Sequence, residues 1–181
     1  MKIGVPKEIK SQENRIGLTP ESVKILTSNG NEVMVENNGG FEAGFYNEQY
    51  KSAGAKIVDK AEDIFNDSEI IVKVKEPQSS EVKMIKENQI VFTYLHLAAA
   101  KELTKGLVDS KSVCIAYETV TDNNGRLPLL APMSAVAGRM SVQAGAHCLE
   151  KNQKGRGLLL GGAPGVDPVS YTHLRAHETS L

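Results

Sequence analysis

The run Ile90-Val91-Phe92-Thr93-Tyr94-Leu95-His96-Leu97-Ala98-Ala99-Ala100 passes from β-branched and aromatic residues through a histidine into small residues. Its first part is too short for a confident helix and predicts a buried strand. In open parallel sheets the ligand crevice lies beyond the carboxyl ends of the strands, where His96 falls. Because histidine titrates near neutrality, His96 is a candidate proton donor and acceptor. A hydrogen-bonded structural histidine is the alternative.

Two further apolar runs end in the same way. The run at 70–74 is followed by Lys75, and the run at 113–117 is followed by Glu118. A lysine at a strand end is usually only solvated, so the recurrence counts for more than any one residue. A cation, a base and a carboxylate are therefore expected along one edge of a single sheet, with His96 as the base.

Strand-like and helix-like segments alternate from residue 2 to residue 119. Thr19 is a good N-cap, Pro20 suits the first helical position, and Gly30 is a plausible stop. The alternation predicts an α/β fold with a doubly wound, mostly parallel sheet. The other expected elements are strands at 2–5, 31–36 and 56–58, helices at 47–53, 61–65 and 101–109, and a helix capped by Ser79 or Ser80 that carries Val82, Met84 and Ile85.

The composition is that of a globular protein. Of 181 residues, 40% are hydrophobic and 24% charged, with a formal net charge of -1, and nothing indicates a nucleic-acid partner. No signal peptide and no apolar run of about 20 residues is present, so a cytoplasmic protein without a membrane segment is expected. Cys114 and Cys148 are expected to be reduced, buried thiols, and no metal site is expected.

A long helix is predicted from Ser134 to about Glu150, after an extended apolar connection at 127–133. It is rich in alanine, glycine and serine, so another backbone can approach it closely, and we expect it to pack between two bodies. Its N-terminal amides and the Ser134 hydroxyl offer a site for a phosphate or carboxylate. The alternative is that Ser134 is only the N-cap.

The glycines at 155–162 do not form a dinucleotide fingerprint. Leu160 stands where G-x-G-x-x-G needs glycine or alanine, and no strand precedes Gly155. Residues 158–160 are expected to be a short strand or connector. His173 and His177 have the helical spacing of half a metal site but lack a third ligand.

Six segments, in order and without obvious gaps, closely resemble bacterial alanine dehydrogenase. The match runs from Met1 to about Val166. The segments are Gly4-Val5-Pro6-Lys7-Glu8, Asn14-Arg15-Ile16-Gly17-Leu18-Thr19-Pro20, Val72-Lys73-Val74-Lys75-Glu76-Pro77, Tyr94-Leu95-His96-Leu97-Ala98, Tyr117-Glu118-Thr119-Val120 and Pro128-Leu129-Leu130-Ala131-Pro132-Met133-Ser134.

The resemblance implies the reversible, NAD-dependent oxidative deamination of L-alanine to pyruvate and ammonia. By position, Arg15 is similar to the family residue that holds the substrate carboxylate, a task that suits a planar, two-pronged donor. Lys75 is similar to the lysine that polarises the substrate oxygen and carboxylate. His96 is similar to the general acid and base.

The resemblance also implies the surroundings of these groups. Glu118 would orient the basic groups, and Tyr94 and Met133 would wall the pocket. Leu130 and Ser134 would face the nicotinamide of the cofactor NAD. The family forms a homohexamer.

Two other interpretations remain open. The alpha subunit of proton-translocating transhydrogenase shares this fold and the opening Gly-x-Pro-x-Glu and Arg-x-x-x-Thr-Pro patterns. The segments at 94–99 and 117–120 favour the amino-acid enzyme. The other interpretation is a non-catalytic module that binds pyruvate or alanine.

The sequence is expected to divide into four parts. These are an incomplete substrate domain (1–132), an interdomain helix (133–152), the truncated start of a Rossmann domain (153–168) and a foreign tail (169–181). The tail departs from the family pattern, with no apolar strand or glycine fingerprint. In full-length members of the family, the catalytic aspartate and most NAD contacts come after the segment that this sequence matches. This fragment alone is therefore expected to be inactive.

Overall fold

The structure is a computed structural model that describes residues 1–168. These residues divide into two units, one from Met1 to Leu127 and one that begins at Pro128. The predicted boundary after residue 132 is not tested by this division. The predicted foreign tail, with His173 and His177, lies outside the described residues.

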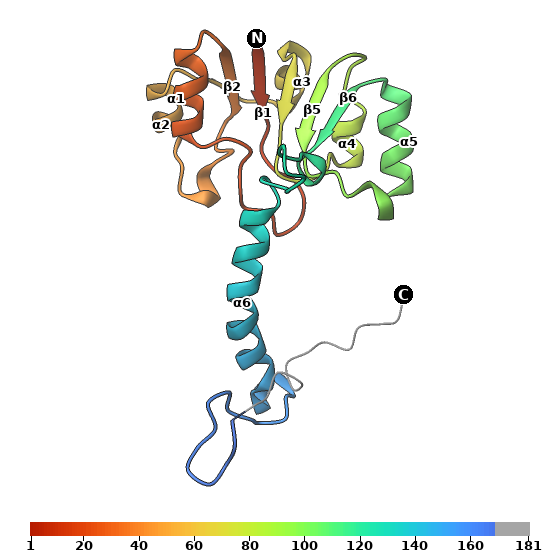
Figure 1. Ribbon diagram of the computed structural model, residues 1–181. Helices are drawn as coiled ribbons and strands as arrows, with labels where there is room; N and C mark the ends of the chain where they lie inside the picture. Colours follow the sequence, from red (N-terminus) through yellow and green to blue (C-terminus); the bar gives the residue numbers. More distant parts are fainter. Residues whose placement is uncertain (169–181) are drawn as a thin grey trace. The chain divides into compact units, whose positions relative to one another are not determined.

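The first unit is built on a wholly parallel six-stranded sheet in the order β3-β2-β1-β4-β5-β6 (Figure 1). The predicted α/β, doubly wound fold is therefore confirmed. The chain builds one half of the sheet outward from β1 and then returns to build the other half beside β1. The strands are β1 (Lys2–Val5), β2 (Glu32–Glu36), β3 (Lys56–Val58), β4 (Ile70–Val72), β5 (Ile90–Thr93) and β6 (Val113–Ala116).

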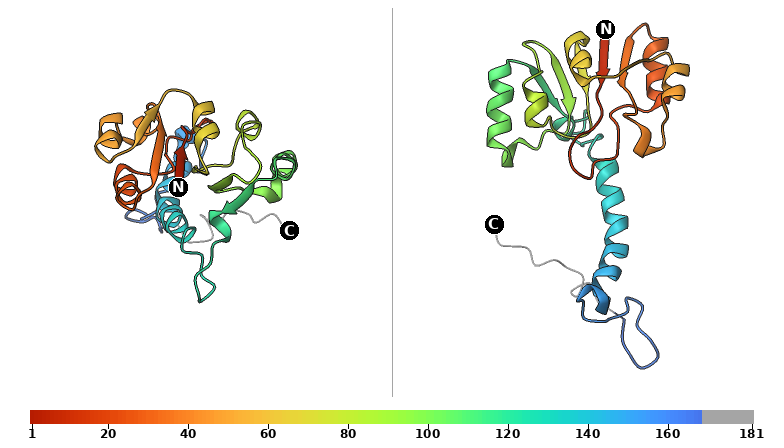
Figure 2. Two further views of the ribbon diagram at one scale, coloured as in Figure 1. Left: turned by 90° about the horizontal axis from the view of Figure 1, so that it is seen from above. Right: turned by 180° about the vertical axis from the view of Figure 1, so that it is seen from behind.

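Helices cover both faces of this sheet, as Figures 1 and 2 show from three directions. α1 (Pro20–Ser28) and α2 (Asn47–Ser52) contribute to one apolar cluster, and α3 (Ala61–Asp67) and α5 (Lys101–Ser110) to the other. α4 (Ser79–Val82) packs against α5. Short 3-10 turns follow β2, β5 and β6: η1 (Phe41–Ala43), η2 (Leu97–Ala99) and η3 (Tyr117–Thr119).

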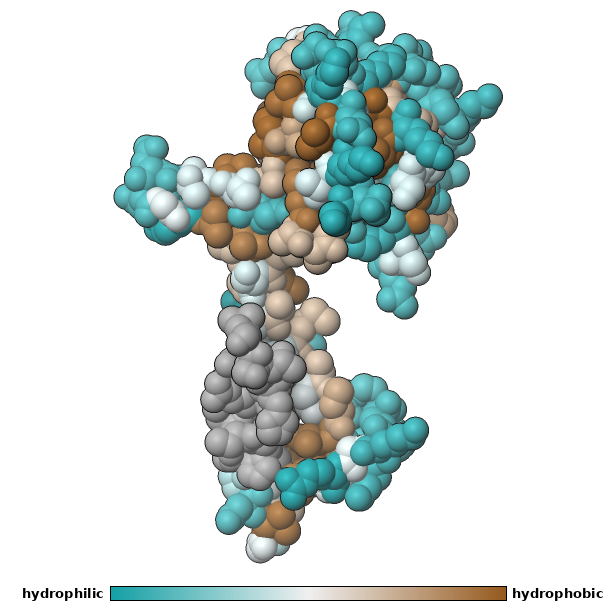
Figure 3. All heavy atoms as spheres, turned by 90° about the vertical axis from the view of Figure 1, so that its right-hand side faces the viewer, coloured by the Kyte–Doolittle hydropathy of each residue, from teal (hydrophilic) through white to brown (hydrophobic). Residues whose placement is uncertain are grey.

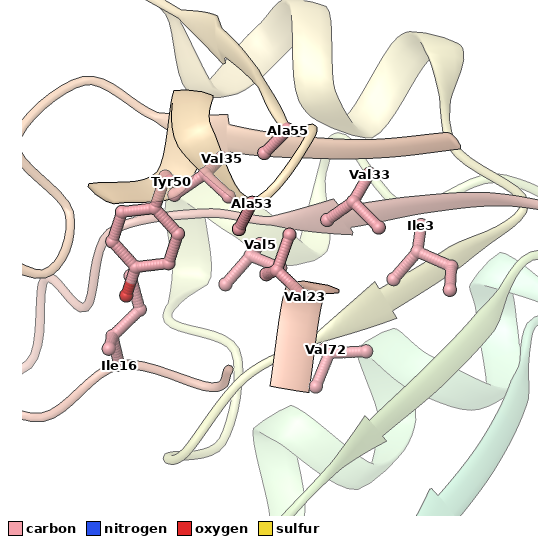
Figure 4. Packing of buried hydrophobic residues seen from close by; sticks show 10 residues of the cluster. All are labelled: Ile3, Val5, Ile16, Val23, Val33, Val35, Tyr50, Ala53, Ala55 and Val72. Atoms are coloured by element: carbon pink, nitrogen blue, oxygen red, sulfur yellow. The ribbon is translucent and has the colours of Figure 1, made fainter. Parts of the chain in front are cut away.

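The alternation of side chains along β2 assigns each residue to one of these clusters. Val33 and Val35 join the cluster with α1 and α2, which Figure 4 shows, whereas Met34 joins the other cluster. Tyr50 lies in the first cluster, where its hydroxyl donates to the carbonyl of Leu18 at 2.9 Å. Burial raises the pKa of Tyr50 to about 12.

The first unit has a largely polar outer surface on the side of α5, as Figure 3 shows. Apolar surface also shows on this face. β6 is an edge strand of the sheet, and its Val113 and Ile115 are exposed.

The second unit contains α6 (Ala131–Leu149) and the 3-10 turn η4 (Lys151–Gln153). α6 starts three residues before the predicted Ser134. Pro132 lies in its first turn, where the backbone N–H groups have no partner within the helix, so a proline costs no hydrogen bond there. The expectation that Ser134 begins the helix is therefore wrong, and the cap residue is Leu130. Residues 158–160 form no strand.

Other local expectations are confirmed or corrected. Thr19 caps α1 as predicted, because its hydroxyl accepts the Ser22 N–H at 3.3 Å. The cap of α4 is Gln78 rather than Ser79 or Ser80, and its N–H donates to the Glu81 carboxylate at 2.7 Å.

The two cysteines are free thiols, as expected, but neither is fully buried. Cys114 is partly exposed in β6, and Cys148 is exposed on α6. Among residues 1–168 no helix combines the length and the apolar character that crossing a bilayer requires.

A fully buried lysine lies where β1 and β4 end side by side. Lys73 follows β4, and its Nζ lies 2.7 Å from Glu81 Oε1 and 3.2 Å from Glu8 Oε2. The side chain of Lys73 is 0% exposed, and those of the two carboxylates are 2% exposed. The second oxygen of Glu8 accepts the N–H of Val74 at 2.6 Å. This network therefore fixes the segment that leads to Lys75.

Replacing Lys73 with methionine is expected to lower the free energy of unfolding by about 3–5 kcal/mol, because two buried carboxylates would lose their cation. Chemical denaturation would measure the loss. Lys83→Met is the matched control, since Lys83 is exposed just after α4. Equal midpoints for the two variants would contradict the role given to Lys73.

Candidate functional site

The backbone of His96 is in the left-handed region, with φ 49° and ψ 40°. This conformation costs a side-chain-bearing residue roughly 1–2 kcal/mol. The residue follows β5 and precedes η2, and its side chain is exposed at the carboxyl edge of the sheet. A strained position of this kind persists only where the surroundings hold it.

Glu118 holds this turn through the backbone. Its Oε1 accepts the N–H of His96 at 2.8 Å and the N–H of Leu95 at 3.0 Å. Partial burial tends to raise the pKa of Glu118, but these N–H groups and the charge of His96 outweigh burial and keep it below the ordinary value. Glu118 therefore carries a negative charge beside His96.

Aromatic rings support the same turn. Tyr94 is buried, and its ring lies nearly parallel to that of His96, with centroids 6.1 Å apart. Tyr94 also meets Tyr117 edge-to-face at 4.9 Å, and Tyr117 meets Phe92 at 4.3 Å. Burial raises the pKa of Tyr117 well above its usual range. The imidazole is thus placed against a fixed apolar wall.

Two cations lie on loops of the same edge. Arg15 is on the loop after β1, and Lys75 is partly buried three residues after β4 ends. The strand was predicted to reach Lys75, but β4 ends at Val72. Lys75 still lies beside the end of β5, because Thr93 Oγ1 donates to the Lys75 carbonyl at 2.9 Å. The N–H of Lys75 makes a long contact of 3.4 Å with Glu8 Oε1.

Two carboxylates beside these groups were not found from the sequence. Glu13 binds Arg15 through both of its oxygens. Glu76 is paired with Lys10. Partial burial tends to raise the pKa of Glu76, but the Lys10 hydrogen bond and the charges of Lys10 and His96 outweigh it and lower the pKa. The only signal in the sequence was a carboxylate within two positions of Arg15 or of Lys75, and solvated loops show the same pattern.

A cavity of about 500 Å³ opens beside His96 and Glu118. These are the only ionisable residues in its lining, which is otherwise mostly apolar. The remaining lining residues are Leu95, Leu97, Ala98, Ala99, Ala116 and Thr119. Arg15, Lys75 and Tyr94 are not part of this lining, so the first unit brings only two of the predicted residues to the cavity itself.

The predicted residues Leu130, Met133 and Ser134 belong to the second unit. Ser134 lies within α6, where its N–H and hydroxyl both approach the Leu130 carbonyl, at 3.2 and 3.4 Å. Their contacts with substrate or cofactor stay predictions. Across residues 1–168 no three histidine, cysteine, aspartate or glutamate side chains gather as metal ligands.

Residues 4–137 match the family "Alanine dehydrogenase/PNT, N-terminal domain". The chain belongs to this family. It is 54% identical over 172 residues to an alanine dehydrogenase of Halomonas elongata, across 95% of this chain and 46% of that protein. The chain therefore spans about half the length of the curated relatives it matches.

Solved structures of the family agree with the fold. An L-alanine dehydrogenase superposes with a TM-score of 0.85 at 54% identity, over 93% of this chain and 46% of that one. A transhydrogenase from Sinorhizobium meliloti superposes with a TM-score of 0.74 at 23% identity, over 83% and 45%. The second likeness shows the shared fold alone, so sequence similarity places the chain nearer the alanine dehydrogenases.

Glu118→Gln is expected to destabilise the first unit by about 1–3 kcal/mol at neutral pH, because a charged acceptor of two N–H groups is lost. The pKa of Glu118 is lower in the folded chain than its ordinary 4.5. The wild-type advantage should therefore be complete above pH 4.5 and shrink as the pH falls through the lowered value.

Denaturant unfolding at several pH values would measure this difference. Glu42→Gln is the control, since Glu42 is exposed in η1 and its loss changes the net charge equally. If the difference in free energy of unfolding between wild type and Glu118→Gln did not change with pH, the role given to the Glu118 charge would be contradicted.

Proposed function

We propose that this chain is the substrate-binding part of an NAD-dependent L-alanine dehydrogenase, which converts L-alanine, NAD and water reversibly to pyruvate, ammonia and NADH. The observation that carries the proposal is the histidine held in a strained turn at the carboxyl edge of the sheet, beside a charged carboxylate and a cavity. By the same family likeness the whole protein is proposed to be a cytoplasmic homohexamer.

His96 is proposed to move the protons of the reaction. In the direction of alanine oxidation, neutral His96 takes a proton from the water that adds to the imine carbon. The protonated ring then gives this proton to the amino nitrogen of the carbinolamine. As the C–N bond breaks, His96 takes the proton of the carbinolamine hydroxyl, and ammonia and pyruvate are released. The fixed backbone supports this role, because Glu118 and Tyr94 restrict where the imidazole can lie.

Arg15 and Lys75 are proposed to bind the substrate. The guanidinium of Arg15 would hold the carboxylate with two parallel N–H bonds. The ammonium of Lys75 would stabilise the negative charge that develops on the substrate oxygen. Lys75 stands on a segment anchored by the buried Lys73 network, and this anchorage supports a positioned rather than a mobile cation.

Bound NAD would accept the hydride from the substrate Cα. The described residues include no glycine-rich phosphate loop, so within them only Leu130 and Ser134 are proposed to contact NAD. The Ser134 side chain is exposed, which is compatible with that contact. Tyr94 and Met133 are proposed to wall the pocket against water.

A chimaera tests this function. The segment of the Halomonas elongata relative that corresponds to residues 1–168 of this chain is replaced by those residues. The chimaera is expected to form NADH from L-alanine. His96→Ala should reduce turnover by about 100- to 10,000-fold, the usual contribution of a general acid and base. Arg15→Lys should raise KM more than it lowers kcat, because the planar fork is lost and the charge kept.

His147→Ala is the matched histidine control, since His147 is exposed on α6. Its turnover is expected to equal that of the unaltered chimaera. A folded chimaera without activity toward L-alanine would refute the proposed function. Full activity in His96→Ala would refute the role of His96.

A further inference from the structure

Arg15 is already engaged by a carboxylate of the same loop. Its Nε donates to Glu13 Oε1 at 2.7 Å and its Nη2 donates to Glu13 Oε2 at 2.6 Å. This is the two-pronged geometry that an arginine gives to a carboxylate ligand. Glu13 therefore already occupies the Nε and Nη2 edge of the guanidinium, which is an edge that a substrate carboxylate could bind.

The pair is unequally covered. The side chain of Glu13 is 7% exposed, whereas that of Arg15 is 49% exposed. A covered carboxylate has exchanged its water for the guanidinium, while about half of the Arg15 side chain still faces solvent. Hydrogen bonds from Arg15 lower the pKa of Glu13, and the charge of Lys75 acts in the same direction. Glu13 thus stands in the field of both proposed substrate-binding cations.

The local backbone keeps Glu13 in place. Gln12 adopts a left-handed φ of 64°, and the N–H of Glu13 donates to the Lys10 carbonyl at 3.1 Å. The N–H of Arg15 donates to Glu13 Oε1 at 2.9 Å. Only Asn14 separates the two residues, so the internal carboxylate is presented to Arg15 at high effective concentration.

We propose that Glu13 is a built-in competitor that occupies the guanidinium of Arg15 until the carboxylate of a short 2-oxo or 2-amino acid displaces it. This inference rests on the proposed function, because it takes Arg15 as the carboxylate site. Its consequence is a weakened apparent affinity, since only the fraction of molecules with Glu13 displaced binds the ligand. The opposite role, in which Glu13 aims Arg15 at the substrate, predicts the opposite effect of its removal.

Isothermal titration calorimetry of the 181-residue chain with pyruvate separates these roles, because it measures the dissociation constant of pyruvate. Glu13→Gln is expected to bind pyruvate about tenfold more tightly than wild type. The glutamine keeps an oxygen for the Arg15 N–H but lacks the second charged oxygen. Glu13→Asp keeps the charge but is one methylene shorter, so it should also bind more tightly and serves if Glu13→Gln fails to fold. Glu42→Gln controls for the change in net charge and should match wild type.

Arg15→Ala should abolish the binding in both backgrounds. Equal or weaker pyruvate binding by a folded Glu13→Gln or Glu13→Asp variant, including no binding, would overturn the inference. The chimaera separates this failure from failure of the proposed function. Alanine oxidation in the chimaera together with unchanged affinity in Glu13→Gln would leave the enzyme assignment standing and remove only the competitor.

Discussion

The buried contact of Lys73 with Glu8 and Glu81 is the constraint on which the edge of the sheet depends. One cation between two carboxylates, all withdrawn from water, persists only when the remaining oxygens are satisfied. The N–H groups of Val74 and Gln78 meet that need. Burial raises the pKa of Glu8, and the charge of Lys73 opposes the rise. The ends of β1 and β4 are thereby joined to the start of α4.

This junction lies where the strand order reverses. β1 neighbours both β2 and β4, so the two halves of the sheet meet at this point. The loop with Arg15 and the segment with Lys75 both leave from this point. The turn with His96 follows the next strand, and Glu118 follows the strand after that. Charged residues that are far apart in the sequence thus lie at the same edge of the parallel sheet.

The family assignment and the site support each other through different residues. Similarity to alanine dehydrogenases extends over nearly the whole chain, including strands that only build the sheet. The strained His96 turn and the Glu13–Arg15 pair are local features that overall similarity does not describe. Both features lie on loops that leave the carboxyl edge of the sheet, which supplies their support. The same fold in a transhydrogenase shows that this support alone does not specify a reaction.

The sequence by itself determined the alternation of strands and helices and the cap at Thr19, because these follow from side-chain period and local hydrogen bonding. Only the tertiary structure decided that Lys73 is buried and where α6 begins. In the run Val-Lys-Val-Lys, Lys73 and Lys75 look alike. Helices cover both faces of this sheet, so Lys73 is enclosed with Glu8, which lies 65 residues earlier. Pairing over such a distance depends on the packed chain, which no local pattern encodes.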